Sequence, residues 1–520
     1  MQGRLEDALY ECERSIRAGW HHHQARALKA AVLRKLGREE EAIIFCVESL
    51  KLDHFNYGCR FEKYLLTGNQ TELDTMNSLM HGNALNYHEL ALDYAQAGLW
   101  EECLKVLSVA EQQTVHPMTF YYKGWAEMRL GDVVEANASF EKAEQTDSYC
   151  CFPNRLEDIL VLRCAGTLNP DGAKAWYYLG CLYYDKRQYD VATEAWDTSL
   201  RLDDTFPATW RCLALAAYNK EHNPQKAQQY MEQAFRRDTT DARILMELDQ
   251  LYKVMQKPHE ERLRFLQQYP EQIQQRDDLV LEEITLLNQT GHYEEAMARL
   301  DARQFHPWEG GEGKVTGQYQ FSRVELAKLC LRPEALDPER ALQLLEACLE
   351  YPHHLGEGKL YGAQENDFYY LMGCAYEALG QTDKARLCWK KATEGPMEPA
   401  AAMYYNDAKP DKIFYAGLAW RKLGEDGKAN GVFYRLITYG EKHLFDTVKM
   451  DYFAVSLPDL LIWDGDLQLN NTIHCKYMMA LGYYGIGSLE KSEHYLKEVE
   501  QLNINHQGIQ ATRSAIKIIC

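Results

Sequence analysis

Large apolar side chains recur at helical spacing around single small residues between positions 173 and 204. In the first half of this segment Gly180 lies between Trp176 and Tyr183, and in the second half Ala192 precedes Trp196 by four residues. Small residues let two antiparallel helices approach closely, and the large side chains fill the space that remains. The pattern predicts a helix–turn–helix unit of about 34 residues, which can bury its apolar face only by stacking on neighbouring units.

The same order of small and large residues recurs along most of the chain. Ala8 and Ala42, which are 34 positions apart (42 − 8), set the same phase near the start. The clearest further copies are Gly124/Gly131/Ala136/Phe140, Gly373/Gly380/Ala385/Trp389 and Gly417/Gly424/Ala429/Phe433. This recurrence predicts an all-α chain of about 20 or more helices without a β-sheet.

The order W-x2-L-G-x2-Y, followed by A-x3-aromatic, resembles the tetratricopeptide repeat (TPR) signature. Trp176, Leu179, Gly180, Tyr183 and Ala192 carry the resemblance. It implies an all-α, TPR-like α–α superhelix, or solenoid, with irregular insertions.

Breaks in the repeat phase divide the chain into three predicted segments. Residues 1–304 form the first part of the superhelix, and residues 305–367 hold a Gly-rich loop and a degenerate helix pair. Residues 368–520 form the second part, with an insertion at 440–472. The opening Gly3–Leu9 resembles the second helix of a repeat whose first helix is absent, so we expect this chain to be the C-terminal part of a longer protein.

Charge and composition narrow the classes of partner. The chain has 57 basic and 77 acidic side chains, a net charge of −20 and a pI near 5.4. An acidic surface repels phosphate backbones and anionic lipids, so neither nucleic acid nor a membrane is an expected partner. Several of the 15 cysteines, such as Cys46, Cys103, Cys181 and Cys374, occupy packing positions, which is typical of a reduced protein and predicts a cytoplasmic location.

Residues 305–318 interrupt the helical pattern with four glycines and one proline. His306, Trp308, Glu309 and Glu312 lie in this loop. An indole that stacks on C–H faces, together with carboxylates that accept hydroxyl protons, suits a sugar-binding site. The alternative is a structural loop whose Trp308 plugs a gap in the superhelix.

The segment Phe305–Val315, with Ser456–Leu461 and Ile473–Cys475, also supports a narrower resemblance. These motifs are similar to the C-terminal half of certain large bacterial proteins, in which a galactose-mutarotase-like β-sandwich domain of unknown function precedes a long TPR tail. The resemblance implies a link to carbohydrate metabolism and assigns no activity to the tail.

A second candidate site is the concave face. In TPR units the fifth position of the first helix points into the groove, and here these positions are His88, Tyr121, Tyr177, Arg211, Leu281, Tyr370, Phe414 and Tyr477. Tyr121, Tyr177, Tyr370, Phe414 and Tyr477 would form an aromatic stripe suited to a peptide, an apolar helix or a glycan. The alternative is that these rings pack against the next repeat. No Lys stands at the fifth position, which departs from the family's two-carboxylate clamp.

Metal, cofactor and catalytic signatures are weak. Asp464 and Asp466 could hold a hard cation, but a capped turn explains them as well, with Asn471 or Thr472 as the expected N-cap of the last repeat. We find no phosphate-binding loop, G-x-S-x-G or H-E-x-x-H motif. We therefore expect no cofactor and no metal, and enzymatic activity is not the favoured reading.

Two functions remain open from the sequence. The first is a non-catalytic scaffold that binds a protein or peptide partner, or the protein's own N-terminal domain. The second is an accessory region of a carbohydrate-active or carbohydrate-binding protein, with residues 306–313 contributing to a glycan site. The position of Trp308, Glu309 and Glu312, in an open groove or buried between helices, separates the two.

Overall fold

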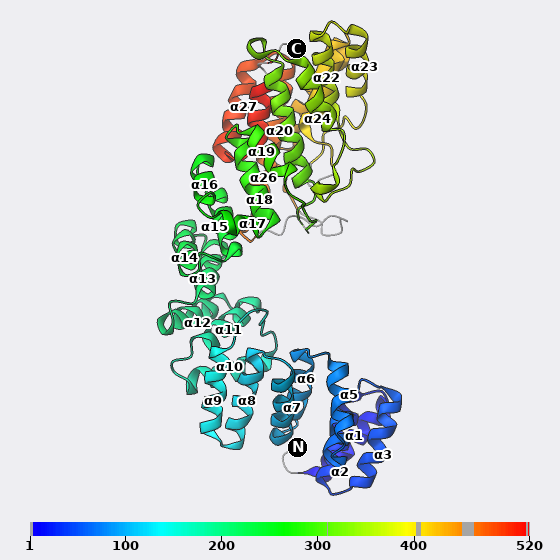
Figure 1. The fold of residues 1–520 in the computed structure, drawn as a ribbon, viewed down its shortest axis with the longest axis vertical. Coiled ribbons are helices and arrows are strands. Elements are labelled where there is room, and N and C mark those ends of the chain that lie inside the picture. Colours follow the sequence, from blue (N-terminus) through cyan, green and yellow to red (C-terminus); the bar gives the residue numbers. More distant parts are fainter. Residues whose placement is uncertain (1–3, 309, 402–406, 450–461, 516–517, 519–520) are drawn as a thin grey trace. The chain divides into compact units, whose positions relative to one another are not determined.

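The computed structural model describes residues 4–308, 310–401, 407–449, 462–515 and 518. These residues contain 28 α-helices and two short 3₁₀-helices, and no β-strand occurs among them. The helices follow one another as antiparallel hairpins, as Figure 1 shows. The prediction of an all-α, TPR-like chain with more than 20 helices is confirmed.

The chain divides into two compact units, residues 1–216 and 217–520. The boundary lies within α13 (Pro207–Asn219) and inside the first of the three segments predicted from the sequence. That three-part division stays a prediction. The helices of the first unit are α1 (Leu5–Ala18), α2 (His23–Lys35), α3 (Glu39–Leu52), α4 (Tyr57–Thr67), α5 (Gln70–Met80), α6 (Ala84–Gln96), α7 (Trp100–Gln113), α8 (Pro117–Leu130), α9 (Val133–Gln145), α10 (Leu156–Leu168), α11 (Ala173–Asp185) and α12 (Tyr189–Leu202).

The second unit continues the hairpins and contains the predicted Gly-rich loop. Its helices are α14 (Pro224–Arg237), α15 (Ala242–Val254), α16 (His259–Leu266), α17 (Pro270–Gln274), α18 (Asp277–Gln289), α19 (Tyr293–Asp301), α20 (Lys314–Cys330), η1 (Pro333–Ala335), α21 (Pro338–Ala347), η2 (His353–Leu355), α22 (Asn366–Ala378), α23 (Thr382–Ala392), α24 (Pro410–Lys422), α25 (Asp426–His443), α26 (Leu467–Gly485), α27 (Leu489–Leu502) and α28 (Gln507–Ala515).

Glycines on the first helix of a hairpin receive aromatic rings from the second helix. A Cβ added to Gly180 in α11 would lie 2.4 Å from the Trp196 indole of α12. In the second unit the same relation joins Gly373 to Trp389, at 2.3 Å. Both rings are buried. The small residue that marked each repeat in the sequence is therefore the point where an aromatic ring touches the backbone of the partner helix.

Two details differ from the sequence-based expectation. The last repeat begins with Asp466 as the N-cap of α26, because its carboxylate accepts from the backbone N–H groups of Gln468 and Leu469 at 2.8 and 3.0 Å. Asn471 and Thr472, the predicted caps, lie inside the helix. Among the cysteines, Cys46 and Cys103 are buried free thiols as expected, whereas Cys374 is disulfide-bonded.

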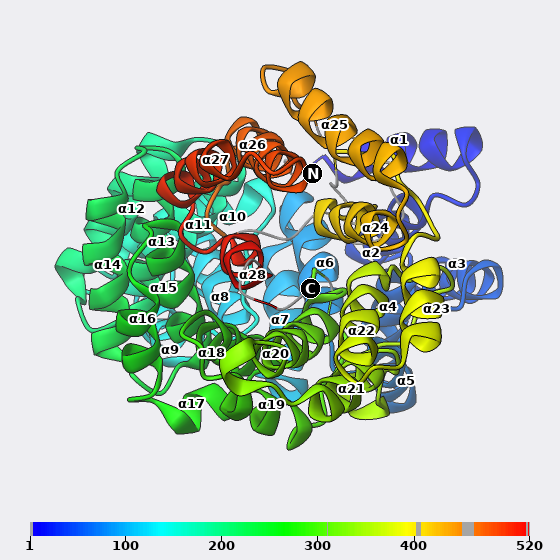
Figure 2. The same cartoon turned by 90° about the horizontal axis from the view of Figure 1, so that it is seen from above.

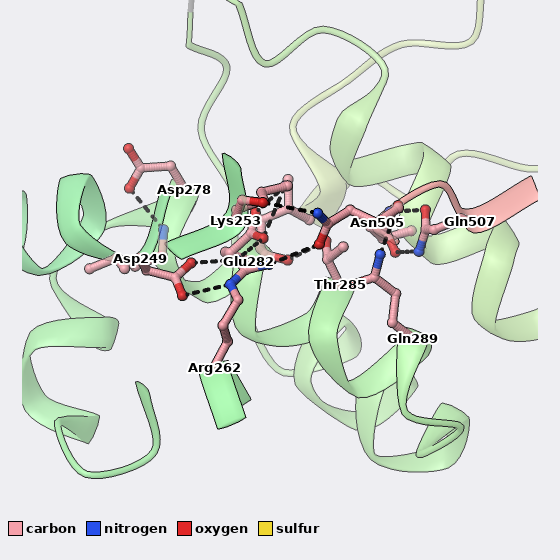
Figure 3. Close-up of polar contacts among 12 residues, drawn as sticks. Asp249, Lys253, Arg262, Asp278, Glu282, Thr285, Gln289, Asn505 and Gln507 are labelled. Carbon is pink, nitrogen blue, oxygen red and sulfur yellow. Dashed lines mark hydrogen bonds and ion pairs between the residues drawn. The ribbon is translucent and has the colours of Figure 1, made fainter. Parts of the chain in front are cut away.

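A buried polar network connects the segment between α27 and α28 to α15, α16 and α18 (Figure 3). The Arg262 guanidinium contacts Asp249 and Glu282, both at 2.7 Å, and donates to the Asn505 side-chain oxygen at 3.2 Å. Gln289 donates to the Asn505 carbonyl at 2.9 Å. Because Arg262 and Asp249 are fully buried, this charge pair depends on both partners being present.

The terminal helix α28 lies between α20 and α27 and contacts both of them (Figure 2). Lys328 of α20 donates to the carbonyl of Ala511 at 2.9 Å, and the side chains of Gln318 and Gln507 exchange hydrogen bonds. Through these contacts the end of the chain closes back on α20, so the helices of the second unit surround a common interior.

Candidate functional site

That interior holds a cavity of about 1100 Å³. Its wall comes from α20, α22, α24, α26 and α28, together with the loop before α20 and residues 351–364. Eight aromatic rings face it, those of Trp308, Phe321, Tyr351, Tyr361, Phe368, Phe414, Tyr415 and Tyr477. A smaller cavity of about 500 Å³ lies in the first unit, between α1, α2 and α6.

The predicted loop site forms part of this wall. His306, Trp308 and Glu312 all line the cavity, whereas Glu309 lies outside the described residues. The Trp308 indole is half-buried and lies over Gly311, where an added Cβ would come within 2.3 Å of the ring. The His306 side chain is exposed and contacts Asp277 at 3.2 Å through Nδ1. The loop therefore borders an open cavity.

Glu357 holds the loop against α20. Its carboxylate accepts from the backbone N–H groups of Gly313 and Thr316, at 2.7 and 3.3 Å, and from the Thr316 hydroxyl at 2.7 Å. These groups belong to the first turn of α20, whose unpaired N–H groups favour a negative partner. No local pattern in the sequence indicates this role, because Glu357 lies 41 residues beyond Thr316 in a second glycine-rich loop.

Of the five side chains in the predicted aromatic stripe, two line the cavity and three lie elsewhere. Phe414 and Tyr477 line the cavity although each side chain is almost fully buried. Tyr370 is buried away from it, and in the first unit Tyr121 is buried and Tyr177 is half-buried against Phe206. The binding role of these five residues stays a prediction, and only two of them share a wall with the loop.

Two ion pairs are built into the wall. Lys412 contacts Asp367 at 2.5 Å, and Lys328 contacts Glu325 at 2.7 Å. Burial works to lower the pKa of Lys412, but the adjacent Asp367 carboxylate more than offsets this and raises the pKa. Both ammonium groups are thus already paired with acidic side chains of the wall.

Tyr415 on α24 presents a hydroxyl group to the cavity. The residue is only 5% exposed, and no hydrogen bond to its hydroxyl occurs among the described residues. Burial raises the pKa of the phenol well above its ordinary value, and the charges of Glu325, Asp367 and Asp411 add to this effect. The phenol is therefore neutral at physiological pH and able to donate or accept a hydrogen bond.

Acidic side chains dominate the charge of the wall. Its carboxylates are Glu312, Glu325, Glu357, Asp367, Asp407 and Asp411, and its cations are Lys328, Lys409 and Lys412. Six carboxylates against three ammonium groups leave an excess of three negative charges (6 − 3) among these nine groups. The sequence did not reveal this cluster, because its members come from three helices and three loops and are up to 100 residues apart (412 − 312).

The described residues contain no group of three or more His, Cys, Asp or Glu side chains placed to hold a metal ion. In the same part of the chain, no helix is both long and apolar enough to cross a membrane.

Comparison with protein families identifies two segments of the chain. Models described as tetratricopeptide repeat match residues 173–206, which contain the hairpin α11–α12, and residues 367–394, which cover the hairpin α22–α23 except for its first residue. These are the segments in which Gly180 and Gly373 accept the rings of Trp196 and Trp389.

Several solved structures are similar to this chain at low identity. MamA (41-end) from Desulfovibrio magneticus RS-1 is 19% identical, over 37% of this chain and 97% of that chain, with a TM-score of 0.22. YrrB, titled a TPR protein with an unusual peptide-binding site, is 15% identical over 44% and 92%, with a TM-score of 0.17. A structure of Naa15/Naa10 bound to HypK-THB is 13% identical over 99% and 94%, with a TM-score of 0.22. With TM-scores this low, no functional detail carries over to this chain.

Proposed function

We propose that this chain, two segments of which match tetratricopeptide-repeat models, is a non-catalytic scaffold and that the cavity of its second unit binds a segment of a protein partner. The carrying observation is the cavity itself, in which the 306–313 loop and the groove residues Phe414 and Tyr477 share one wall. Repeat folds use such concave surfaces to bind extended or helical segments.

The size and lining of the cavity support a peptide as the occupant. At about 1100 Å³ it is slightly larger than the range of roughly 300–1000 Å³ typical of small-molecule pockets. Aromatic side chains can receive apolar anchors of a peptide, while the polar groups between them fix its orientation.

A cavity-filling variant tests this function. A Cβ at Gly317, a wall residue of α20, meets nothing within 4 Å, so Gly317→Leu adds an isobutyl group at a wall position that has room for its Cβ. The matched control is Gly431→Leu in α25, which is also a helical glycine with open space around its Cβ and lies outside the cavity. Both changes improve helix propensity by up to about 1 kcal/mol.

The probe is a set of fluorescein-labelled, randomised decapeptide libraries, measured by anisotropy. We expect Gly317→Leu to weaken binding at least tenfold, while Gly431→Leu binds as the unmodified protein does. The proposal fails if no library binds the protein, or if filling the cavity leaves binding unchanged.

A glycan site is the second candidate function, favoured by the placement of Trp308 and Glu312 on the cavity wall. Trp308→Ala would then abolish binding on a glycan array and leave peptide binding largely intact. Loss of peptide binding alone would support the scaffold instead. The association with a galactose-mutarotase-like β-sandwich domain stays a prediction, and co-purification of that domain with this chain would test it.

A further inference from the structure

We propose that the cavity of the second unit selects a basic partner segment, whose lysine or arginine head group lies beside Tyr415 and Asp411. This inference rests on the proposed function, because it specifies the chemistry of the segment that the cavity would bind. It draws on three features of the wall, namely its uncompensated negative charge, its unpaired phenol and its aromatic faces.

The negative charge remains after the wall's own pairs are formed. Glu325 and Asp367 are neutralised by Lys328 and Lys412. Among the described residues Glu357 accepts hydrogen bonds from backbone N–H groups and a hydroxyl, and Glu312 is exposed. Lys409, the third cation of the wall, interacts with both Asp407 and Asp411, so negative charge remains in excess. A cationic ligand would lower the repulsion among these carboxylates, whereas an acidic one would add to it.

Asp411 and Tyr415 give the head group a specific place. Both lie on α24, one turn apart, and both line the cavity. The Tyr415 hydroxyl can accept one N–H bond from an ammonium or guanidinium group, and the Asp411 carboxylate can accept another. Because the Tyr415 side chain is only 5% exposed, its hydroxyl is held largely in place before a donor binds.

The aromatic faces already interact with ammonium groups in this wall. Lys412 Nζ lies 4.4 Å from the centre of the Phe368 ring, and Lys328 Nζ lies 5.9 Å from that of Tyr415. Cations are attracted to such faces within roughly 6 Å. Because both lysines are already paired with carboxylates, an acidic ligand would first have to break those pairs.

Three decapeptide libraries of identical design test the inference. They share randomised apolar positions and differ only at four fixed positions, which hold Lys or Arg, Gln, or Glu. We expect the basic library to bind at least tenfold more tightly than the Gln library, and the Glu library to bind least. Raising the salt concentration should weaken binding of the basic library and leave that of the Gln library nearly constant.

Two matched variants test whether the preference for basic peptides arises in the cavity. Asp411→Asn removes one wall charge from the second position of α24, and Asp383→Asn removes a charge from the same position of α23, outside the cavity. We expect basic-library binding to fall about three- to tenfold for the first variant and to stay unchanged for the second. Tyr415→Phe, which removes only the hydroxyl, should also weaken the basic library more than the Gln library.

The outcomes separate the two proposals. If the Gln or Glu library binds as tightly as the basic one, and Gly317→Leu abolishes that binding, the cavity binds peptides but the preference for basic ones is wrong. If Asp411→Asn and Asp383→Asn reduce basic binding equally, the peptides follow the general acidity of the chain, and the inference is likewise overturned. If no library binds, the proposed function itself fails.

Discussion

Gly180→Ala should destabilise the first unit, although alanine is the better helix former. The added Cβ would lie 2.4 Å from Cδ1 and Nε1 of Trp196, where contacts of about 3.5–4.0 Å are normal. The indole would therefore have to move by about 1 Å in a site where it is only 2% exposed. Such overpacking costs about 1–3 kcal/mol.

A second cost comes from the indole N–H. Trp196 Nε1 donates to the carbonyl of Tyr177 at 3.1 Å, and a displaced indole leaves a buried donor unsatisfied, at about 1–3 kcal/mol. The higher helix propensity of alanine offsets about 1 kcal/mol of these costs. The net loss in the free energy of unfolding is thus about 1–5 kcal/mol.

A double-mutant cycle in urea, followed by circular dichroism, measures this effect. Trp196→Val makes room for the new methyl group, so Gly180→Ala should cost little in that background, with a coupling of at least about 1 kcal/mol. Hydrogen exchange should place the loss of protection in α11 and α12. A Gly180→Ala variant as stable as the unmodified protein, with no coupling to Trp196, would refute the close-approach argument.

Three further predictions concern the second unit. Arg262→Met should lower the free energy of unfolding by about 3–5 kcal/mol, because it leaves the buried Asp249 carboxylate without its partner. Arg264→Met, on the exposed side of the same helix, should have little effect. Equal effects of the two variants in urea unfolding would contradict this prediction. Burial lowers the pKa of His506 from 6.5 to about 4, so the folded state binds this proton less well than the unfolded state. Stability should be full above pH 6.5 and fall by at most about 3 kcal/mol towards pH 4, and thermal unfolding of His506→Asn across that range should lack this component. Asp466→Ala should lower the free energy of unfolding by about 1 kcal/mol, because α26 loses its N-cap, and Thr472→Ala should lower it clearly less. If Thr472→Ala lowered the melting temperature more than Asp466→Ala, Thr472 would be the N-cap instead.

The repeat fold was predictable because its determinants are local. Gly180 and Trp196 are 16 residues apart, within one hairpin, and the same pairing at Gly373 and Trp389 marks a second copy. A helical period with small residues at the close approach specifies a hairpin wherever it occurs. The start of α26 was misplaced, because several residues there are able to cap a helix and only the folded backbone shows which one does.

The cavity, by contrast, was decided by the tertiary structure. Trp308 and Glu312 were noticed in the sequence because glycines interrupt a helical pattern there. Nothing local indicates that they would share a wall with Tyr415, which the repeat phase did not single out. Nor could the sequence show that Glu357 would be held by the start of α20. Helical periodicity determines which residues pair within a hairpin. The residues that meet across the interior depend instead on the angles between successive hairpins and on the contact of α28 with α20. Those contacts join positions far apart in the chain, so no local pattern in the sequence specifies them.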